Sequence, residues 1–248
     1  MNHNGSKSRA PHEAGLPPYQ VVLAETDWGS LQTAFGNGED LPKVLSRLLE
    51  PDPKVQVTAL SELSELVGHQ NSIYEATAPV AMYVAGILTH PAAVTLRPYL
   101  NVPIRATLLN WLASTAYDAS DEIVDRTEQY FPGFLTHDTA VTAFRDLRTM
   151  LYRAVAPFLQ DSNEDVSEAA ALAVIILAEH PALAEHRDHL AVHARHILGT
   201  SSDDLNRRVA WKALEAWGHD IPDPERFREE PRDWGPHSDG RGDLEPPF

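Results

Sequence analysis

The chain has 248 residues, no cysteine and a formal net charge of −16, and 43% of its residues are hydrophobic. This composition supplies enough apolar material for a core and excludes disulfides and thiolate zinc sites. It also makes nucleic acid a poor partner, because a phosphate-binding protein needs a basic surface, and it favours a basic protein, which complementary charge would attract. The plainer alternative is that the acidity only aids solubility.

Both ends of the chain are predicted to be disordered arms. Residues 1–24 are rich in Pro, Gly, Ser and His without periodicity, and residues 221–248 form an acidic, Pro-rich tail. Residues 1–10 lack the apolar run of a signal peptide, and no stretch of the sequence is long and apolar enough to span a membrane. We therefore expect a cytoplasmic protein without a membrane partner, folded over residues 25–220.

The folded part is predicted to be helical from its beginning. Asp27 is a candidate N-cap for a short helix that carries Trp28 and ends at Gly36. A second helix begins at Leu41, and Asp52 followed by proline predicts the start of a third. Strand alternation of useful length is absent from the sequence.

Three helices share apolar residues at relative positions 0, 4, 8 and 11. Each follows a polar turn and an earlier helix that ends in leucine, which predicts helix–turn–helix units. The positions are held by Val55, Ala59, Leu63 and Leu66, by Val166, Ala170, Val174 and Leu177, and by Leu205, Val209, Ala213 and Ala216, with a weaker copy in Ile104, Leu108, Leu112 and Ala116. The unequal spacing predicts an acidic insertion between Tyr117 and Asp138.

The stretch 166–178 is apolar on nearly every side, so it is predicted to be the central helix of a packed array. Together with the repeated units, it favours an all-α solenoid of about four irregular HEAT-like repeats over residues 25–220. A compact helical bundle is the alternative.

The N-terminal third resembles a known family. It contains Trp28-x-x-Leu31-x-x-Ala34-Phe35-Gly36, Asp40-Leu41-Pro42 and the run from His69 to Pro79. These segments resemble bacterial HEAT-repeat domain proteins of high-GC genomes, which carry a His-Gln-Gly-Thr-x-Tyr-x-Ala-Thr motif after the first repeat; this chain has Asn71-Ser72 in place of Gly-Thr. The resemblance implies a HEAT fold and an interaction module, and some HEAT-like proteins are immunity partners of secreted toxins.

The run that begins at His69 has two interpretations. His69, Gln70, Tyr74 and Glu75 could form a polar recognition site at the end of a repeat. Alternatively, Ser72 and Glu75 form a capping box that starts the next helix, which explains their spacing without a ligand.

Four histidines lie at helical spacing near the C-terminal end: His186, His189, His193 and His196. Two imidazoles one turn apart can bind zinc, nickel or copper. Arg187 and Arg195 make the region less suited to a cation, and the favoured interpretation is a solvated polar face. We therefore expect no metal and no cofactor.

Catalytic motifs are also missing from the sequence. Glycine-rich phosphate loops and His-Glu-x-x-His are absent, and the pairs Asp121-Glu122 and Asp203-Asp204 fit the acidic first turns of helices. We expect no catalytic residue.

A binding surface is predicted along the second helices of the units, which line the concave face of a HEAT solenoid. Trp211 beside Arg208 is the composition of a binding hot spot, although it could instead pack under the tail or the adjacent helix. The predicted surface comprises Glu62, Glu65, Arg105, Arg208, Trp211, Lys212 and Glu215.

These observations predict a non-enzymatic protein-binding scaffold, an immunity or regulatory partner of a basic protein. The alternative is a HEAT-like enzyme of the alkylpurine DNA glycosylase type, which needs a basic concave surface.

Overall fold

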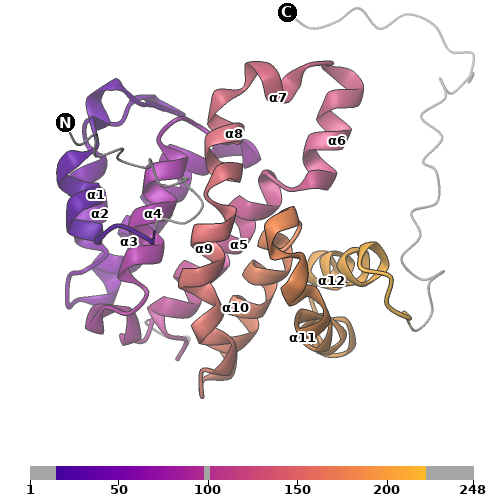
Figure 1. Ribbon diagram of the computed structural model, residues 1–248. Helices are drawn as coiled ribbons and strands as arrows, with labels where there is room; N and C mark the ends of the chain where they lie inside the picture. Colours follow the sequence, from indigo (N-terminus) through magenta and orange to yellow (C-terminus); the bar gives the residue numbers. More distant parts are fainter. Residues whose placement is uncertain (1–14, 98–100, 222–248) are drawn as a thin grey trace, which may run out of the picture.

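The computed structural model describes residues 15–97 and 101–221, and this part of the chain is mostly helical (Figure 1). The strands within it are β1 (Gln32–Thr33) and β2 (Gly36–Asn37), which form one antiparallel ribbon. The predicted all-α class is confirmed.

The helices follow one another through short connections. The first five are α1 (Tyr19–Glu25), α2 (Leu41–Arg47), α3 (Pro53–Gly68), α4 (Thr77–Ile87) and α5 (Ile104–Asp118). The others are α6 (Asp121–Tyr130), α7 (Phe134–His137), α8 (Thr139–Asp146), α9 (Arg148–Val155), α10 (Glu164–Leu177), α11 (Arg187–Thr200) and α12 (Asp204–Ala216). Short 3₁₀ helices join them: η2 (Trp28–Ser30), η3 (His69–Asn71), η4 (Pro91–Val94), η5 (Ala156–Gln160) and η6 (Pro181–His186).

Helix α10 is the central element, as its sequence predicts. It packs most extensively on α5 and also contacts α9, α11, α12 and η5 (Figure 1). All four predicted core positions on α10 are buried, as are those on α5 from Ile104 to Ala116. Alanines on α10 such as Ala170 and Ala173 are fully buried, and their small side chains suit close packing.

Local signals placed several helix starts correctly. The Asp52 side chain accepts a hydrogen bond from Lys54 N at 2.8 Å, with Pro53 in the first turn of α3. At α12, Asp203 accepts from the N–H groups of Leu205 and Asn206. These caps satisfy N–H groups that have no partner inside the helix.

The N-terminal segment departs from prediction in two places. The expected disordered arm contains α1, which packs on α4 and buries Val22, so the arm is wrong over residues 19–24; residues 1–14 lie outside the described part. The expected helix over 27–36 is η2 followed by the β1–β2 ribbon. Within the ribbon's turn, Thr33 Oγ1 donates to Gly36 O and accepts from Phe35 N. This local bonding offers the backbone an alternative to a helix.

On α3 and α12, the buried face is rotated about the helix axis relative to the predicted one. On α3, Ala59 and Leu63 are buried as expected, but Gln56, Leu60 and Val67 complete the arc. On α12, the buried residues are Ala210, Trp211 and Leu214, whereas Leu205 is 42% exposed. The helices form as predicted, but a neighbouring face of each is buried.

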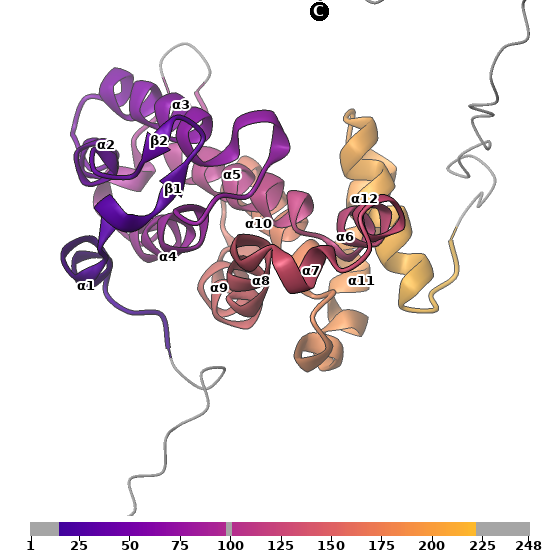
Figure 2. The ribbon, with the colours of Figure 1, turned by 90° about the horizontal axis from the view of Figure 1, so that it is seen from above.

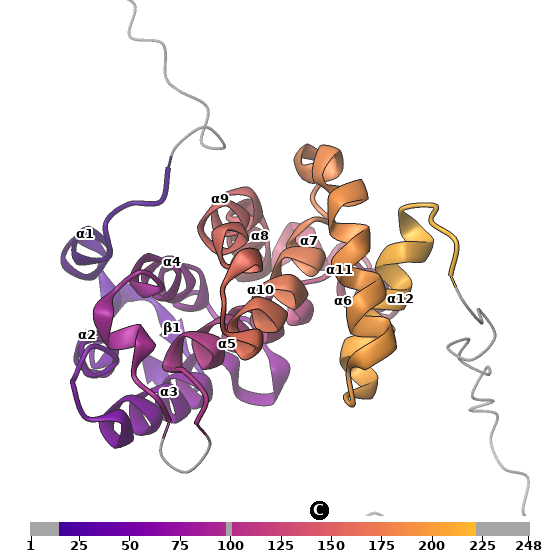
Figure 3. The same ribbon diagram turned by 90° about the horizontal axis from the view of Figure 1, so that it is seen from below.

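The predicted acidic insertion between α5 and α8 is a helical arm made of α6 and α7 (Figure 1). Figure 2 shows α6 beside α12, at the opposite end of the molecule from α1 and α2. Figure 3 shows α11 and α12 packed side by side at this same end. The insertion therefore lies next to the last helical pair.

Candidate functional site

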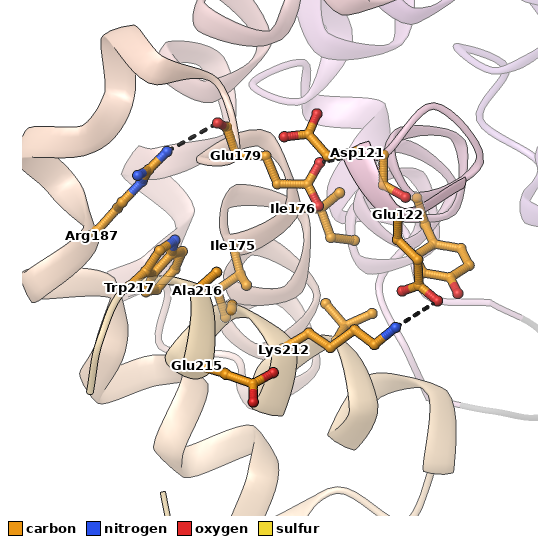
Figure 4. Close-up of a pocket in the computed structure, with 14 residues that line it drawn as sticks. Asp121, Glu122, Ile175, Ile176, Glu179, Arg187, Lys212, Glu215, Ala216 and Trp217 are labelled. Carbon is orange, nitrogen blue, oxygen red and sulfur yellow. Dashed lines mark hydrogen bonds and ion pairs between the residues drawn. The ribbon is translucent and has the colours of Figure 1, made fainter. Parts of the chain in front are cut away.

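A cavity of about 550 Å³ lies where α6, α10 and α12 meet the end of α5; we call it the α10–α12 pocket (Figure 4). Its apolar wall comes from Ile175, Ile176, Val209, Ala213 and Ala216, and its aromatic side chains are Tyr117 and Trp217. The polar lining consists of Ser120, Asp121, Glu122, Glu179, Arg187, Lys212 and Glu215.

Glu122 is the centre of a charged cluster on one side of the pocket. Its Oε1 lies 2.8 Å from Lys212 Nζ, 2.8 Å from Arg126 Nη2 and 3.9 Å from Arg208 Nη2. Arg208 Nη2 also donates to the Tyr117 hydroxyl at 2.5 Å. The negative charge of Glu122 is therefore shared among three cations, and two of them, Lys212 and Arg208, attach α6 to α12.

Asp121 and Glu179 form a second charged cluster in the lining of the pocket. Asp121 Oδ1 accepts from Arg145 at 2.6 Å and from Arg148 at 3.1 Å. Glu179 Oε2 accepts from the Asp121 backbone N–H at 2.8 Å and lies 3.6 Å from Arg148 Nη1. A carboxylate thus occupies the first turn of α6, as the helix macrodipole favours.

The two carboxyls titrate in opposite directions. Burial raises the pKa of Glu179 to about 7, and the nearby charge of Asp121 also raises it. The hydrogen bond from the Asp121 N–H and the charges of Arg148 and Arg145 act in the opposite direction but are outweighed. Burial acts on Asp121 in the same sense, but the hydrogen bonds and charges of Arg145 and Arg148 bring its pKa below its ordinary value. Asp121 is therefore ionised at neutral pH, whereas Glu179 is poised near half-protonation.

The two cations of the lining are held by other groups. Arg187 donates from Nε to Ala178 O and from Nη2 to Glu179 O, both at 3.0 Å, and so satisfies carbonyls at the end of α10. Lys212 points to Glu122 (Figure 4). By contrast, Glu215 is exposed at the mouth, and no ion pair to it is found within the described residues. Glu215 and the second carboxylate oxygen of Glu179, Oε1, thus remain as acceptors for a ligand.

Two of the predicted binding residues, Lys212 and Glu215, line this pocket, and a third, Arg208, lies 3.9 Å from Glu122 of its lining. Their neighbour Trp211 is only 5% exposed and belongs to the core of α12. The prediction of Trp211 as an exposed hot spot is therefore wrong, because the face of α12 that carries it packs inward.

The other predicted cluster is far from this pocket, around the α3–α4 connection. Glu62 pairs with Arg47, and Glu65 Oε2 lies 3.1 Å from His69 Nδ1. The Tyr74 hydroxyl donates to His69 O at 3.3 Å, while Gln70 is exposed with a φ of 55°. Their bonds are made largely with one another and with the backbone.

The capping box predicted from Ser72 and Glu75 does not form. Helix α4 begins at Thr77, and Glu75 instead accepts from the backbone N–H of Gln32 at 3.0 Å, joining the loop to β1. Thr77 Oγ1 accepts from Tyr74 N and donates to Val67 O. The loop is therefore fixed by a long-range contact and by a single buried threonine.

Arg105 has a structural role. It donates to Leu88 O at 2.8 Å, pairs with Asp161 at 3.3 Å and lies 4.9 Å over the ring of Phe158. Arg105 is therefore not a free surface cation. It connects the start of α5 to the C-terminal end of α4 and to the end of η5.

The histidine row divides between two elements. His186, in η6, stacks on Tyr152 at 4.8 Å, while His189 and His193 on α11 have ring centroids 5.7 Å apart. Burial, together with the charges of His189 and His196, lowers the pKa of His193. Within residues 15–97 and 101–221, no group of three or more histidine or acidic side chains is arranged to hold a metal ion.

Sequence reasoning missed Glu179 and Trp217. Each lies just beyond the end of a predicted helix, where periodicity gives no information about side-chain direction. The only signal was their position after the apolar runs of α10 and α12.

The comparisons with known proteins give no relative. No family model, no curated protein and no solved structure matches the chain. Among the described residues, no helix is both long and apolar enough to cross a bilayer. The pocket and the charge of the chain are therefore the features that bear on its function.

Proposed function

We propose that this chain is a non-enzymatic interaction module that binds a basic protein through its C-terminal half, as an immunity or regulatory partner in the cytoplasm. The observation that carries the proposal is the α10–α12 pocket, which combines an apolar wall, two aromatic side chains and carboxylates that their own neighbours do not fully neutralise. Concave sites of this kind, with a few polar groups on an apolar lining, are typical of ligand and partner recognition.

The charge of the chain supports a basic partner. At −16 overall, its field attracts a basic protein and accelerates the encounter, whereas it repels the phosphates of nucleic acid. This weighs against a glycosylase of the alkylpurine type, which would need a basic groove to hold DNA.

We further propose that the helices form a short, irregular HEAT-like solenoid. Three helical pairs support this arrangement: α2–α3 and α11–α12, each joined by a short turn, and α9–α10, joined through η5. The close packing of α10 on α5, across the inserted α6–α7 arm, is what makes the array irregular. In such arrays, stacked units form a continuous binding surface.

Binding of labelled probes tests the function. Fluorescence anisotropy would compare a 12-residue peptide of alternating arginine and glycine with a duplex DNA of about 20 base pairs, at about 50 and 300 mM salt. We expect the peptide to bind the full chain more tightly at low salt, because complementary charges are screened as salt rises. Tight, salt-sensitive binding of DNA without binding of the peptide would overturn the proposal.

A further inference from the structure

Resting on the proposed function, we infer that the α10–α12 pocket receives an arginine side chain of the basic partner. The side chains around the opening form a ring in Figure 4, with Trp217 and Arg187 on one side, Glu122 and Lys212 on the other, and Ile175 and Ile176 between them. An inserted side chain would enter this ring from solvent past Glu215.

The apolar wall suits the stem of a long side chain. Ile175, Ile176 and Val209 offer carbon surface, and the volume of about 550 Å³ accommodates one basic side chain with attendant water. Arginine and lysine both bury their methylene stems on apolar surface while the charged head remains among polar groups.

The electrostatics of the pocket favour a cation at its centre. Lys212 and Arg187 direct their charges to Glu122 and to backbone carbonyls, while Glu179 and Glu215 retain acceptor capacity. Helix α12 also ends here, at Ala216, whereas the ends of α5 and α10 already hold Arg145 on Ala119 O and Arg187 on Ala178 O. Helix C-termini carry partial negative charge and attract cations. The opposing N-terminus of α6 already has the Glu179 carboxylate against its first N–H.

The aromatic lining distinguishes arginine from lysine. A planar guanidinium stacks on an aromatic face such as Trp217 and can bond a carboxylate with two parallel N–H groups. An ammonium makes neither the flat stack nor the paired hydrogen bonds. The pocket presents both partners, an indole and carboxylates, within one ring (Figure 4).

The test uses single amino-acid derivatives as probes of the full chain. The ¹⁵N NMR signals of the tryptophan indole N–H groups would be followed during titration with N-acetyl-arginine amide, assigning Trp217 with a Trp217→Phe variant. We expect a saturable shift of the Trp217 signal with the arginine probe. The neutral isostere N-acetyl-citrulline amide should bind at least about tenfold more weakly, since it lacks the charge, and the lysine probe should bind more weakly than arginine.

Two variants test the carboxylates. Glu179→Gln keeps an acceptor for the Asp121 N–H and should weaken arginine binding about tenfold, because Glu179 is half-buried. Glu215→Gln should weaken it only about threefold, because Glu215 is exposed. Glu50→Gln, at an exposed position between α2 and α3, is the matched control and should bind like the parent.

Equal binding of arginine and citrulline, preference for N-acetyl-glutamate amide, or no shift of Trp217 would overturn the inference. These titrations use the parent protein, so they test the inference even if a variant is unstable. If the arginine–glycine peptide binds but Trp217 does not respond, the pocket is misassigned while the proposed function stands. If neither probe binds, both fail.

Discussion

Trp211 lies on the buried face of α12 together with Ala210 and Leu214. We predict that Trp211→Ala lowers the free energy of unfolding by about 3–5 kcal/mol, because it leaves a large cavity between packed helices. Urea denaturation followed by circular dichroism measures this. The adjacent Lys212→Ala, which loses only a half-exposed ion pair with Glu122, should cost less than about 1 kcal/mol. Equal effects of the two variants would show that Trp211 is not part of the core.

Glu179 gives a pH-dependent prediction. Its pKa is raised from 4.5 to about 7 on folding, so the native state holds this proton more tightly than the unfolded chain. The stabilisation is fully present below about pH 4.5 and is lost as the pH rises through 7. Glu179→Gln removes the charge that forms at high pH, and its melting temperature should exceed that of the parent at pH 8 but match it at pH 4.

Calorimetric melting at the two pH values checks this prediction, with Glu50→Gln as the control for the loss of an exposed charge. A Glu179→Gln variant that melts below the parent at pH 8 would contradict this prediction. It would show that the attraction between the Glu179 carboxylate and Arg148 stabilises the fold by more than the burial of the charge destabilises it.

The residue scale also shows where periodicity fails. The apolar pattern on α12 fits the arc of Leu205 and Val209, but one large side chain, Trp211, buries more surface and turns its own face inward. The pattern was reliable on α10 and α5, where apolar residues surround the helix and the choice of face matters little.

At the scale of elements, Thr77 fixes the start of α4. Its fully buried hydroxyl accepts from Tyr74 N at 2.9 Å and donates to Val67 O at 2.8 Å. We predict that Thr77→Val costs roughly 1–3 kcal/mol in unfolding free energy, because the same shape leaves both backbone groups without this partner. Thr77→Ser keeps the hydroxyl and should cost less; chemical denaturation of both variants measures the difference. A Val variant as stable as the Ser variant would contradict this role.

Helix starts were predictable where the cause is local. Asp52 and Asp203 act on N–H groups two or three residues ahead, so their sequence context suffices. The loop after α3 was not predictable, since Glu75 bonds Gln32 N across 43 positions, and no local pattern encodes that contact. The β1–β2 ribbon was missed for the related reason that its strands have only two residues each.

At the scale of the whole molecule, helical spacing of apolar residues and the lack of strand alternation predicted the helical class, and the apolar run over 166–178 predicted the central helix. The candidate site was predicted only in part: Lys212 and Glu215 were named together with Arg208 and Trp211, but the pocket is also lined by Glu179, Trp217 and the start of α6. These come from separate elements that meet only through the packing of α6 and α12 around α10.

Hydrogen–deuterium exchange of the full chain, with and without the arginine–glycine peptide at saturation, tests the central claim most directly, because it locates the binding surface. We predict increased protection at the start of α6, the end of α10 and the second half of α12, and no change in the loop from His69 to Tyr74. Protection confined to that loop, or spread evenly over α3 and α4, would contradict the assignment of partner binding to the α10–α12 pocket.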